Sequence, residues 1–300
     1  MSRSRWADFY RHFPIIAELR AIRREIGSLR EEMRSMRALL HRSATLDTVR
    51  LLHFELARDP RYSDPKRLFN SAHQVFSQDG EDGMIAEICR RIGAPARQFV
   101  EIGVSDGLEN NTIYLLAQGW RGWWLEGDSA AIASIRSRFR RELAGGALTV
   151  GEARVTAENI APLLGELRVP AEFDVLSLDI DRNTYWVWAA MNDYRPRVAV
   201  IEYNATFPAG VDWKVEYRPE AMWNGTSYFG ASLTALELLG RKMGYALVGC
   251  SFSGVNAFFV REELCGDLFA RPFTAENHYE PPRFGLIARA SHPACFNDIE

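Results

Sequence analysis

The chain has 300 residues, a hydrophobic content of 47% and a formal net charge of −3. This length and composition are sufficient for one large globular domain with an appendage. The small negative charge argues against a nucleic-acid-binding protein, so we expect no nucleic-acid partner. No apolar run reaches the roughly 18 residues that a membrane-spanning helix needs, and the N-terminus has no apolar signal-peptide core. The sequence therefore predicts a cytoplasmic protein.

The first 45 residues differ from the rest of the chain because they carry a heptad pattern. Apolar residues recur at alternating intervals of four and three, with Arg and Glu at most other positions. Such a seam is typical of a coiled coil and predicts a homo-oligomer formed through residues 15–40. The alternative is an amphipathic helix that packs on its own domain. The seam residues are Ile15, Leu19, Ile22, Ile26, Leu29, Met33, Met36 and Leu40.

A third interpretation of this segment is contact with a membrane surface. Its first 50 residues hold 11 Arg against 6 Asp and Glu, and aromatic residues lie near the start. Basic and aromatic residues suit an interfacial helix, although the interspersed glutamates weaken this interpretation. Residues 46–75 carry prolines and polar turns and are predicted to be a linker into a main domain over residues 76–300.

A strand, a glycine turn, a helix and a second strand follow one another near the middle of the chain. The apolar run 99–102 indicates a buried strand. Glu101, Gly103 and Gly107 have E-x-G-x-x-x-G spacing, which suits a tight turn that lets a ligand approach the backbone. The second strand ends at Glu126, 25 residues after Glu101, where an acid can bind ribose hydroxyls. This pattern predicts one half of a nucleotide-binding βαβ unit.

The acid before the first glycine distinguishes between two nucleotide ligands. A dinucleotide-binding turn usually carries glycine there, whereas Glu101 can receive the cationic end of S-adenosylmethionine (SAM). An NAD-dependent oxidoreductase on the same fold is therefore the less favoured interpretation.

Further strands are predicted at 147–150, 173–178 and 197–201, followed by a closing hairpin of 246–248 with 257–260. Strands and helices alternate from residue 84 to 204, which predicts a mainly parallel sheet whose ligands bind beyond the strand C-termini. Acids at the predicted strand ends are expected to share this functional edge. They are Glu126, Asp179, Asp181 and Glu202.

These residues resemble those of class I SAM-dependent methyltransferases and, more narrowly, of the FkbM-like methyltransferases from bacterial secondary-metabolite and polysaccharide clusters. The resemblance spans roughly residues 75 to 265. It implies an α/β fold with a Rossmann-like, seven-stranded, mostly parallel sheet, helices on both faces and a final hairpin, here preceded by the N-terminal helical segment. It is carried by SQDGEDG (77–83), FVEIGVSDGLENNT (99–112), LSLDIDRNTYWVW (176–188), VIEYNA (200–205) and GVNAFFVRE (254–262).

The resemblance also implies a SAM site and one departure from the family pattern. The glycine turn would line the methionine half of SAM, Glu126 would hold the ribose, and Asp179 would lie near the transferred methyl. Relatives often have glycine where this chain has Arg182, which could alter the acceptor pocket or pair with Asp181. The expected SAM-binding residues are Glu101, Gly103, Ser105, Asp106, Gly107, Asn111, Glu126, Gly127, Asp128 and Asp179.

The implied reaction is O-methylation of a sugar, polysaccharide or secondary-metabolite hydroxyl, that is, of a small-molecule or glycan acceptor. The transfer depends on positioning, and an oxygen acceptor must lose its proton. Because no histidine lies between residues 74 and 277, the candidate catalytic bases are Asp179, Asp181 and Glu202. Alternatively, Mg²⁺ held by Asp179, Glu202 and Asn204 would lower the acceptor pKa.

Two segments next to the predicted site have open roles. The loop 77–83 either caps the following helix or covers the cofactor. The stretch 205–230 is either a lid that packs on the domain or an aromatic surface for a sugar ring. A non-catalytic interaction protein, with a degenerate SAM fold anchored by its coiled coil, is the alternative to an enzyme.

Overall fold

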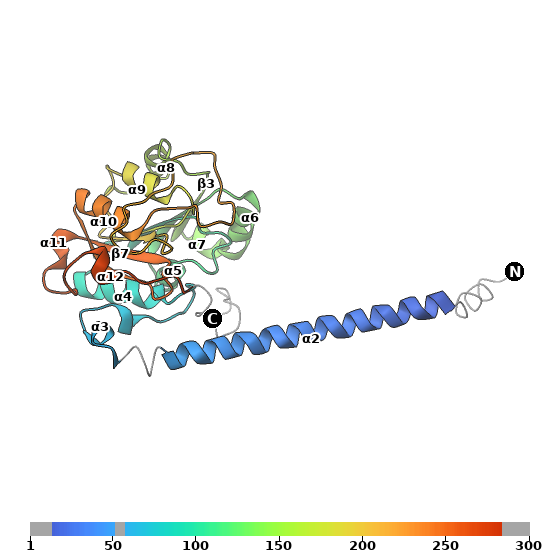
Figure 1. Ribbon diagram of the computed structural model, residues 1–300. Helices are drawn as coiled ribbons and strands as arrows, with labels where there is room; N and C mark the ends of the chain where they lie inside the picture. Colours follow the sequence, from blue (N-terminus) through green and yellow to red (C-terminus); the bar gives the residue numbers. More distant parts are fainter. Residues whose placement is uncertain (1–13, 52–57, 284–300) are drawn as a thin grey trace.

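The structure is a computed structural model that describes residues 14–51 and 58–283. It contains an α/β domain built on one seven-stranded sheet with the order β3-β2-β1-β4-β5-β7-β6 (Figure 1). The strands from β3 to β5 in that order are parallel, and β7 is antiparallel to both β5 and β6. The strands are β1 (Gln98–Ile102), β2 (Arg121–Glu126), β3 (Leu148–Glu152), β4 (Val175–Leu178), β5 (Val198–Glu202), β6 (Tyr245–Cys250) and β7 (Asn256–Arg261).

This sheet confirms the predicted fold class, including the final hairpin. Strand residues alternate between two separate apolar cores, one on each face of the sheet. Helices therefore cover both faces. Val100 and Ile102 of β1 pack with α8, α9 and α10, whereas Phe99 packs with α4 and α5 on the other face. The helices are α2 (Pro14–Arg50), α3 (Pro60–Ser63), η3 (Phe69–Ser71), α4 (Glu81–Ile92), α5 (Ile113–Ala117), α6 (Ser129–Arg138), α7 (Arg140–Ala144), α8 (Ile160–Glu166), α9 (Thr184–Ala190), α10 (Leu233–Lys242), α11 (Glu262–Cys265) and α12 (Ala275–His278).

The N-terminal helix is a separate feature of the chain. Figure 1 shows α2 as a single uninterrupted helix, and it ends beyond the predicted limit of residue 45. Residues after 58 pack onto the domain rather than forming an open linker, since Tyr62 and Leu68 are buried and Leu68 belongs to the core around α4. Among the residues that the structure describes, no helix is both long and apolar enough to cross a membrane.

Helix α5 begins directly after two residues whose backbone N–H groups donate to a buried carboxylate. The backbone N–H groups of Asn111 and Thr112 donate to Glu101, at 2.9 and 3.1 Å. The helix starts at Ile113. Glu101 thus fixes the position of the segment that follows the glycine turn.

Gly103 is required where β1 meets β4. Its φ is +84°, and a Cβ on it would lie 1.7 Å from the carbonyl oxygen of Asp179. The two strands are held together there because the Asp179 N–H donates to the Ile102 carbonyl at 3.0 Å. No side chain fits between them.

We expect Gly103→Ala to destabilise the fold severely, and Gly146→Ala to serve as its control. Both glycines have positive φ, but nothing lies within 4 Å of a Cβ at Gly146. The control should lose about 1–2 kcal/mol for its left-handed backbone, whereas Gly103→Ala should lose about 4 kcal/mol or more because strands must separate. Urea unfolding measures both. Equal losses would contradict the close approach of β1 and β4.

Candidate active site at the ends of the parallel strands

Four neighbouring strands end in one row. Leu125, Ile102, Leu178 and Ile201 are paired side by side across β2, β1, β4 and β5. The next residues along each strand are therefore neighbours too, and they are Glu126, Gly103, Asp179 and Glu202. The sheet brings the predicted strand-end acids to one edge, with Gly103 between Glu126 and Asp179.

A cavity of about 710 Å³ opens at this edge. That volume lies in the ordinary range of small-molecule sites, about 300–1,000 Å³. Most of the expected cofactor residues line it. They are Glu101, Gly103, Ser105, Asp106, Asn111, Glu126, Gly127 and Asp179.

Two expected cofactor residues have other roles in the structure. Gly107 lies beneath the turn, where a Cβ would meet the Trp124 ring at 2.9 Å and the Phe139 ring at 3.1 Å. Asp128 caps α6 by accepting a hydrogen bond from the Ala130 N–H at 2.8 Å. Neither residue lines the cavity, so their contribution to the site is structural.

Glu126 holds the glycine turn against the end of β2. Its carboxylate accepts the Ser105 N–H at 2.7 Å and the N–H groups of Gly127 and Asp128 at 2.7 and 2.9 Å. Ser105 has a positive φ of 49°, an uncommon conformation for a residue with a side chain. The carboxylate therefore sits at the cavity wall among backbone donors.

Glu101 is the buried acid at the end of β1. Its carboxylate accepts three donors, the third being the Thr112 hydroxyl at 2.5 Å. Burial raises the pKa of Glu101 to about 7, although hydrogen bonds from Thr112 and Asn111 oppose the rise. Glu101 lines the cavity, but its carboxylate also accepts hydrogen bonds from the two residues just before α5.

The loop 77–83 borders the same cavity through Gln78 and Glu81. Asp82 shapes this loop by accepting N–H groups from three consecutive residues, 75 to 77, at 2.7–2.9 Å. Glu81 is buried and accepts the Asn256 side-chain amide at 2.9 Å. Burial and the neighbouring Asp79 raise the pKa of Glu81 to about 7. The loop therefore serves both as a helix start and as a cavity wall.

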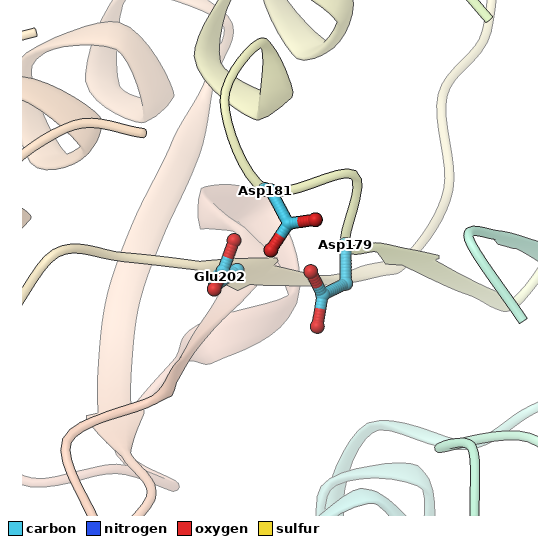
Figure 2. A group of neighbouring side chains, drawn as sticks. All are labelled: Asp179, Asp181 and Glu202. Carbon is cyan, nitrogen blue, oxygen red and sulfur yellow. The ribbon is translucent and has the colours of Figure 1, made fainter. Parts of the chain in front are cut away.

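Asp179, Asp181 and Glu202 form a carboxylate cluster, and Figure 2 shows the three side chains converging. One oxygen of each lies within 4.8 Å of the others. Asp181 has a positive φ of 57°, which aspartate tolerates better than most residues. Asp179 and Asp181 line the cavity, whereas Glu202 does not.

Burial raises the pKa values of the carboxyl groups in this cluster. It raises the pKa of Asp179 to about 6, with a further contribution from the charge of Asp181. Burial and then the charges of Asp179 and Asp181 raise the pKa of Glu202 well above its ordinary value. The Oε2 atom of Glu202 is buried and has no hydrogen-bond donor among the described residues. A proton or a cation would satisfy it.

Asn204, expected as a third metal ligand, is used differently. Its side-chain amide donates to the carbonyls of Ser227 and Phe229 at 2.8 and 2.9 Å, and its oxygen accepts the Thr206 N–H at 3.1 Å. These bonds close the loop that follows β5. Asp181 takes the third place in the cluster instead.

Arg182 does not form an ion pair with Asp181, which was one of the two roles predicted for it. Its guanidinium lies 5.0 Å from the ring centroid of Tyr228 and donates to the Glu216 carbonyl at 3.4 Å. The neighbouring Asn183 donates to the Arg218 carbonyl at 2.9 Å. The segment after Asp181 therefore anchors the stretch 205–230.

The stretch 205–230 forms a lid at the mouth of the cavity. Arg154, in the segment after β3, donates to the Glu220 carbonyl at 2.6 Å, and Trp186 donates to the Val215 carbonyl at 2.9 Å. The lid residues that line the cavity are Pro219, Ala221, Met222 and Trp223. Of the six aromatic residues in this stretch, only Trp223 lines the cavity. Phe207 and Trp213 instead stack on each other.

No protein-family model matches the chain, and no curated protein matches it either. Solved structures similar to it include the N-terminal domain of EvdMO1 with SAH bound (14% identity, TM-score 0.40, covering 69% of this chain and 94% of that one). Another is a putative caffeoyl-CoA O-methyltransferase from Staphylococcus aureus (12% identity, TM-score 0.43, covering 70% of this chain and 92% of that one). A third is the O-methyltransferase from Bacillus cereus in complex with SAH (19% identity, TM-score 0.35, covering 55% of this chain and 76% of that one). Identities this low concern the fold alone.

Stability should fall as pH rises, because the folded chain keeps protons that the unfolded chain loses. Between pH 4.5 and 7 the raised pKa values of buried carboxyls make the folded state bind more protons. Burial lowers the pKa of His278 to about 3, and this single group opposes the effect of the several carboxyls without outweighing it. The free energy of unfolding therefore decreases with pH. Glu202→Gln removes one such carboxyl. We expect its melting temperature to fall less between pH 5 and pH 8 than that of the wild type, by about 2–4 °C.

Thermal unfolding across this pH range is the measurement. Glu276→Gln is the matched control, since Glu276 is an exposed glutamate in the first turn of α12. The control should keep the wild-type pH dependence. An identical dependence for Glu202→Gln and the control would show that the cluster does not retain protons.

Proposed function

We propose that this protein is a SAM-dependent methyltransferase, related to the FkbM-like enzymes, that methylates a hydroxyl group of a sugar, polysaccharide or secondary metabolite. The observation that carries the proposal is the strand-end row. It sets Glu126 and the Gly103 turn on one side of a single cavity, and Asp179 with Asp181 on the other. A donor and an acceptor can therefore occupy adjacent parts of one site.

The donor half is the part nearest the glycine turn. SAM would place its ribose at Glu126, because a carboxylate at the end of the second strand can accept both hydroxyls. Gly103 lines the cavity without a side chain and so leaves room for the methionine portion. Glu101 and Glu81 supply negative charge or carboxyl oxygens near the ammonium and sulfonium groups.

The acceptor half lies between the carboxylate cluster and the lid. Trp223 and Met222 line the cavity and are also 49% and 73% exposed, so they are available to a bound molecule. An aromatic face beside polar groups suits a sugar ring. The lid is tied to the segment after β3 by Arg154, which limits the opening.

The reaction forms one O–CH₃ bond as one S–CH₃ bond breaks. The acceptor oxygen attacks the methyl carbon, the bonding electrons return to sulfur, and S-adenosylhomocysteine leaves. The hydroxyl proton must go to a base. Asp179 is the proposed base because it lines the cavity and its pKa of about 6 leaves it ionised at neutral pH. Glu202, its neighbour in the cluster, would hold the proton afterwards.

A divalent cation is a second candidate partner of the same cluster. Three carboxylate oxygens within 4.8 Å and the unpartnered Glu202 Oε2 fit a hard ion such as Mg²⁺. Asp179, Asp181 and Glu202 would hold it. Such an ion lowers the pKa of a hydroxyl bound to it.

SAM binding should depend on Glu126 and not on its strand neighbour Glu152. The two glutamates are directly paired across β2 and β3, but only Glu126 lines the cavity. Glu126→Ala should weaken SAM roughly 10- to 100-fold, the value of lost charged hydrogen bonds, whereas Glu152→Ala should leave it unchanged. Calorimetric titration with SAM and with NAD measures this. No binding of SAM by the wild type would reject the enzyme proposal, and NAD binding would favour an oxidoreductase.

Loss of Asp179 should abolish methyl transfer while SAM still binds. With radiolabelled SAM and a panel of mono- and oligosaccharides, Asp179→Asn should transfer the label about 10²–10⁴-fold more slowly. The product label should resist mild alkali, as a methyl ether does and a methyl ester does not. Full activity of Asp179→Asn, or an alkali-labile product, would contradict the assigned base or the hydroxyl acceptor.

The metal is tested separately by Mn²⁺ titration followed by electron paramagnetic resonance. Asp181→Asn should weaken Mn²⁺ binding at least about tenfold, and Glu216→Gln, which removes an exposed carboxylate paired with Arg218, should not. Absence of Mn²⁺ binding by the wild type would remove the cation and leave the carboxylates as the proton acceptor.

A further inference from the structure

The apolar seam of α2 has no covering element among the residues that the structure describes. Its seven described members are 44–68% exposed, which is unusual for large apolar side chains arranged in one stripe. The side chain of Ile15 lies outside the described residues. The seam residues with exposed side chains are Leu19, Ile22, Ile26, Leu29, Met33, Met36 and Leu40.

A long helix exposed in this way needs a partner. Most helical stability in proteins comes from packing an apolar face rather than from intrinsic helix propensity. Gly27 in the middle of α2 lowers its intrinsic stability by about 1 kcal/mol relative to alanine. From residue 15 to 40 the seam extends about 39 Å at the usual rise per residue. A second helix of the same length would cover it.

The charged residues beside the seam show which helix fits. With the seam at positions a and d of the heptad, the g positions are Glu18, Glu25 and Glu32. The e positions that follow five residues later are Arg23, Arg30 and Arg37. All six side chains are exposed, and no ion pair joins any of them to another described residue. One flank of the seam is thus acidic and the other basic.

This pattern is complementary to itself in only one orientation. In a parallel, in-register pair, each g residue faces the e residue five positions later on the other helix. Glu18 of one copy then faces Arg23 of the second copy, and the next two heptads repeat this match. In an antiparallel pair, g faces g and e faces e, which sets Glu against Glu and Arg against Arg.

We propose that α2 forms a parallel, in-register, two-stranded coiled coil with α2 of a second copy of this chain. The six Glu–Arg contacts, three along each side, select both the orientation and the register. Ile26 at a with Leu29 at d is the combination that favours two strands, while the methionines at 33 and 36 adapt to either number. Leu19 at a with Ile22 at d favours larger bundles.

The parallel orientation has a structural consequence. The α/β domain follows the C-terminal end of α2 in each copy, so both domains emerge at the same end of the coiled coil. Two sites held together in this way raise the effective concentration of each for a ligand that carries repeated groups.

Charge reversal on the full chain tests the pairing. Light scattering coupled to size exclusion should give the wild type a mass of two 34.1 kDa chains. The triple variant Arg23→Glu, Arg30→Glu, Arg37→Glu should raise the dimer dissociation constant at least about tenfold, because every contact becomes Glu against Glu. Adding Glu18→Arg, Glu25→Arg and Glu32→Arg to this variant should restore the dimer.

The control reverses the same number of arginines outside the seam. Arg20→Glu, Arg24→Glu and Arg34→Glu change positions b and f of the heptad and should leave the dimer intact. Circular dichroism of each variant separates loss of pairing from unfolding of the α/β domain. An equal loss of dimer in the control and the seam variant would reject the e–g contacts.

Disulfide trapping tests the orientation. In a parallel pair, Ile22→Cys and Met36→Cys should each cross-link to the same position of the second copy under mild oxidation. In an antiparallel pair these positions lie far from their own copies, near opposite ends of the seam. The wild type under the same oxidant controls for the native cysteines.

Three results would overturn the proposal. A monomeric wild type that floats with anionic phosphatidylglycerol vesicles would make α2 a membrane-surface helix. A monomer without vesicle binding would leave α2 unpaired. A mass of three or four chains would replace two strands by a larger bundle. Enzymatic activity and SAM binding do not enter any of these measurements, so the outcome is independent of the proposed function.

Discussion

The close contact between the ends of β1 and β4 is the constraint on which the site depends. The Gly103 backbone lies against the Asp179 carbonyl at a distance that excludes any side chain. Because of this contact, Glu126 and Asp179 are separated only by a bare turn of backbone. The cavity can then extend from one carboxylate to the other without an intervening side chain.

The carboxylates at these strand ends are costly to keep. Burial disfavours the charged form of a carboxyl group. In the folded chain the pKa values of Asp179 and Glu202 are therefore raised, and the Glu101 carboxylate accepts three hydrogen bonds. Residues that lower the stability of the fold at neutral pH are therefore the ones best placed for proton transfer or cation binding. This opposition between stability and chemistry is common at functional sites.

Much of this arrangement could be predicted from the sequence. The strand-end acids were found because short apolar runs end in Glu126, Asp179 and Glu202, and parallel strands present their ends at one edge. The alternation of strands and helices predicted the sheet for the same reason. These are local patterns with a regular spatial consequence.

Other features depended on contacts between distant segments, which spacing does not encode. Asn204 follows the end of a strand, where a metal ligand is expected. Its amide nevertheless donates to the backbone carbonyls of residues 23 and 25 positions later and so closes a loop. Gly107 belongs to the glycine pattern but is needed for packing against Trp124. Asn256 lines the cavity from β7, a strand for which the sequence predicted no part in the site. Side-chain partners of this kind become apparent only in the folded chain.

The segment after β4 connects the two halves of the site. Asp181 has a left-handed backbone, and the residues that follow it turn toward the lid, where Arg182 contacts Tyr228 and Asn183 holds the Arg218 carbonyl. A glycine at position 182 would permit the turn but would lose both contacts of the Arg182 side chain, with the Tyr228 ring and with the Glu216 carbonyl. The position of Asp181 in the cluster and the position of the lid are thus set by the same three residues. A change in the lid would therefore also shift the carboxylates of the cluster.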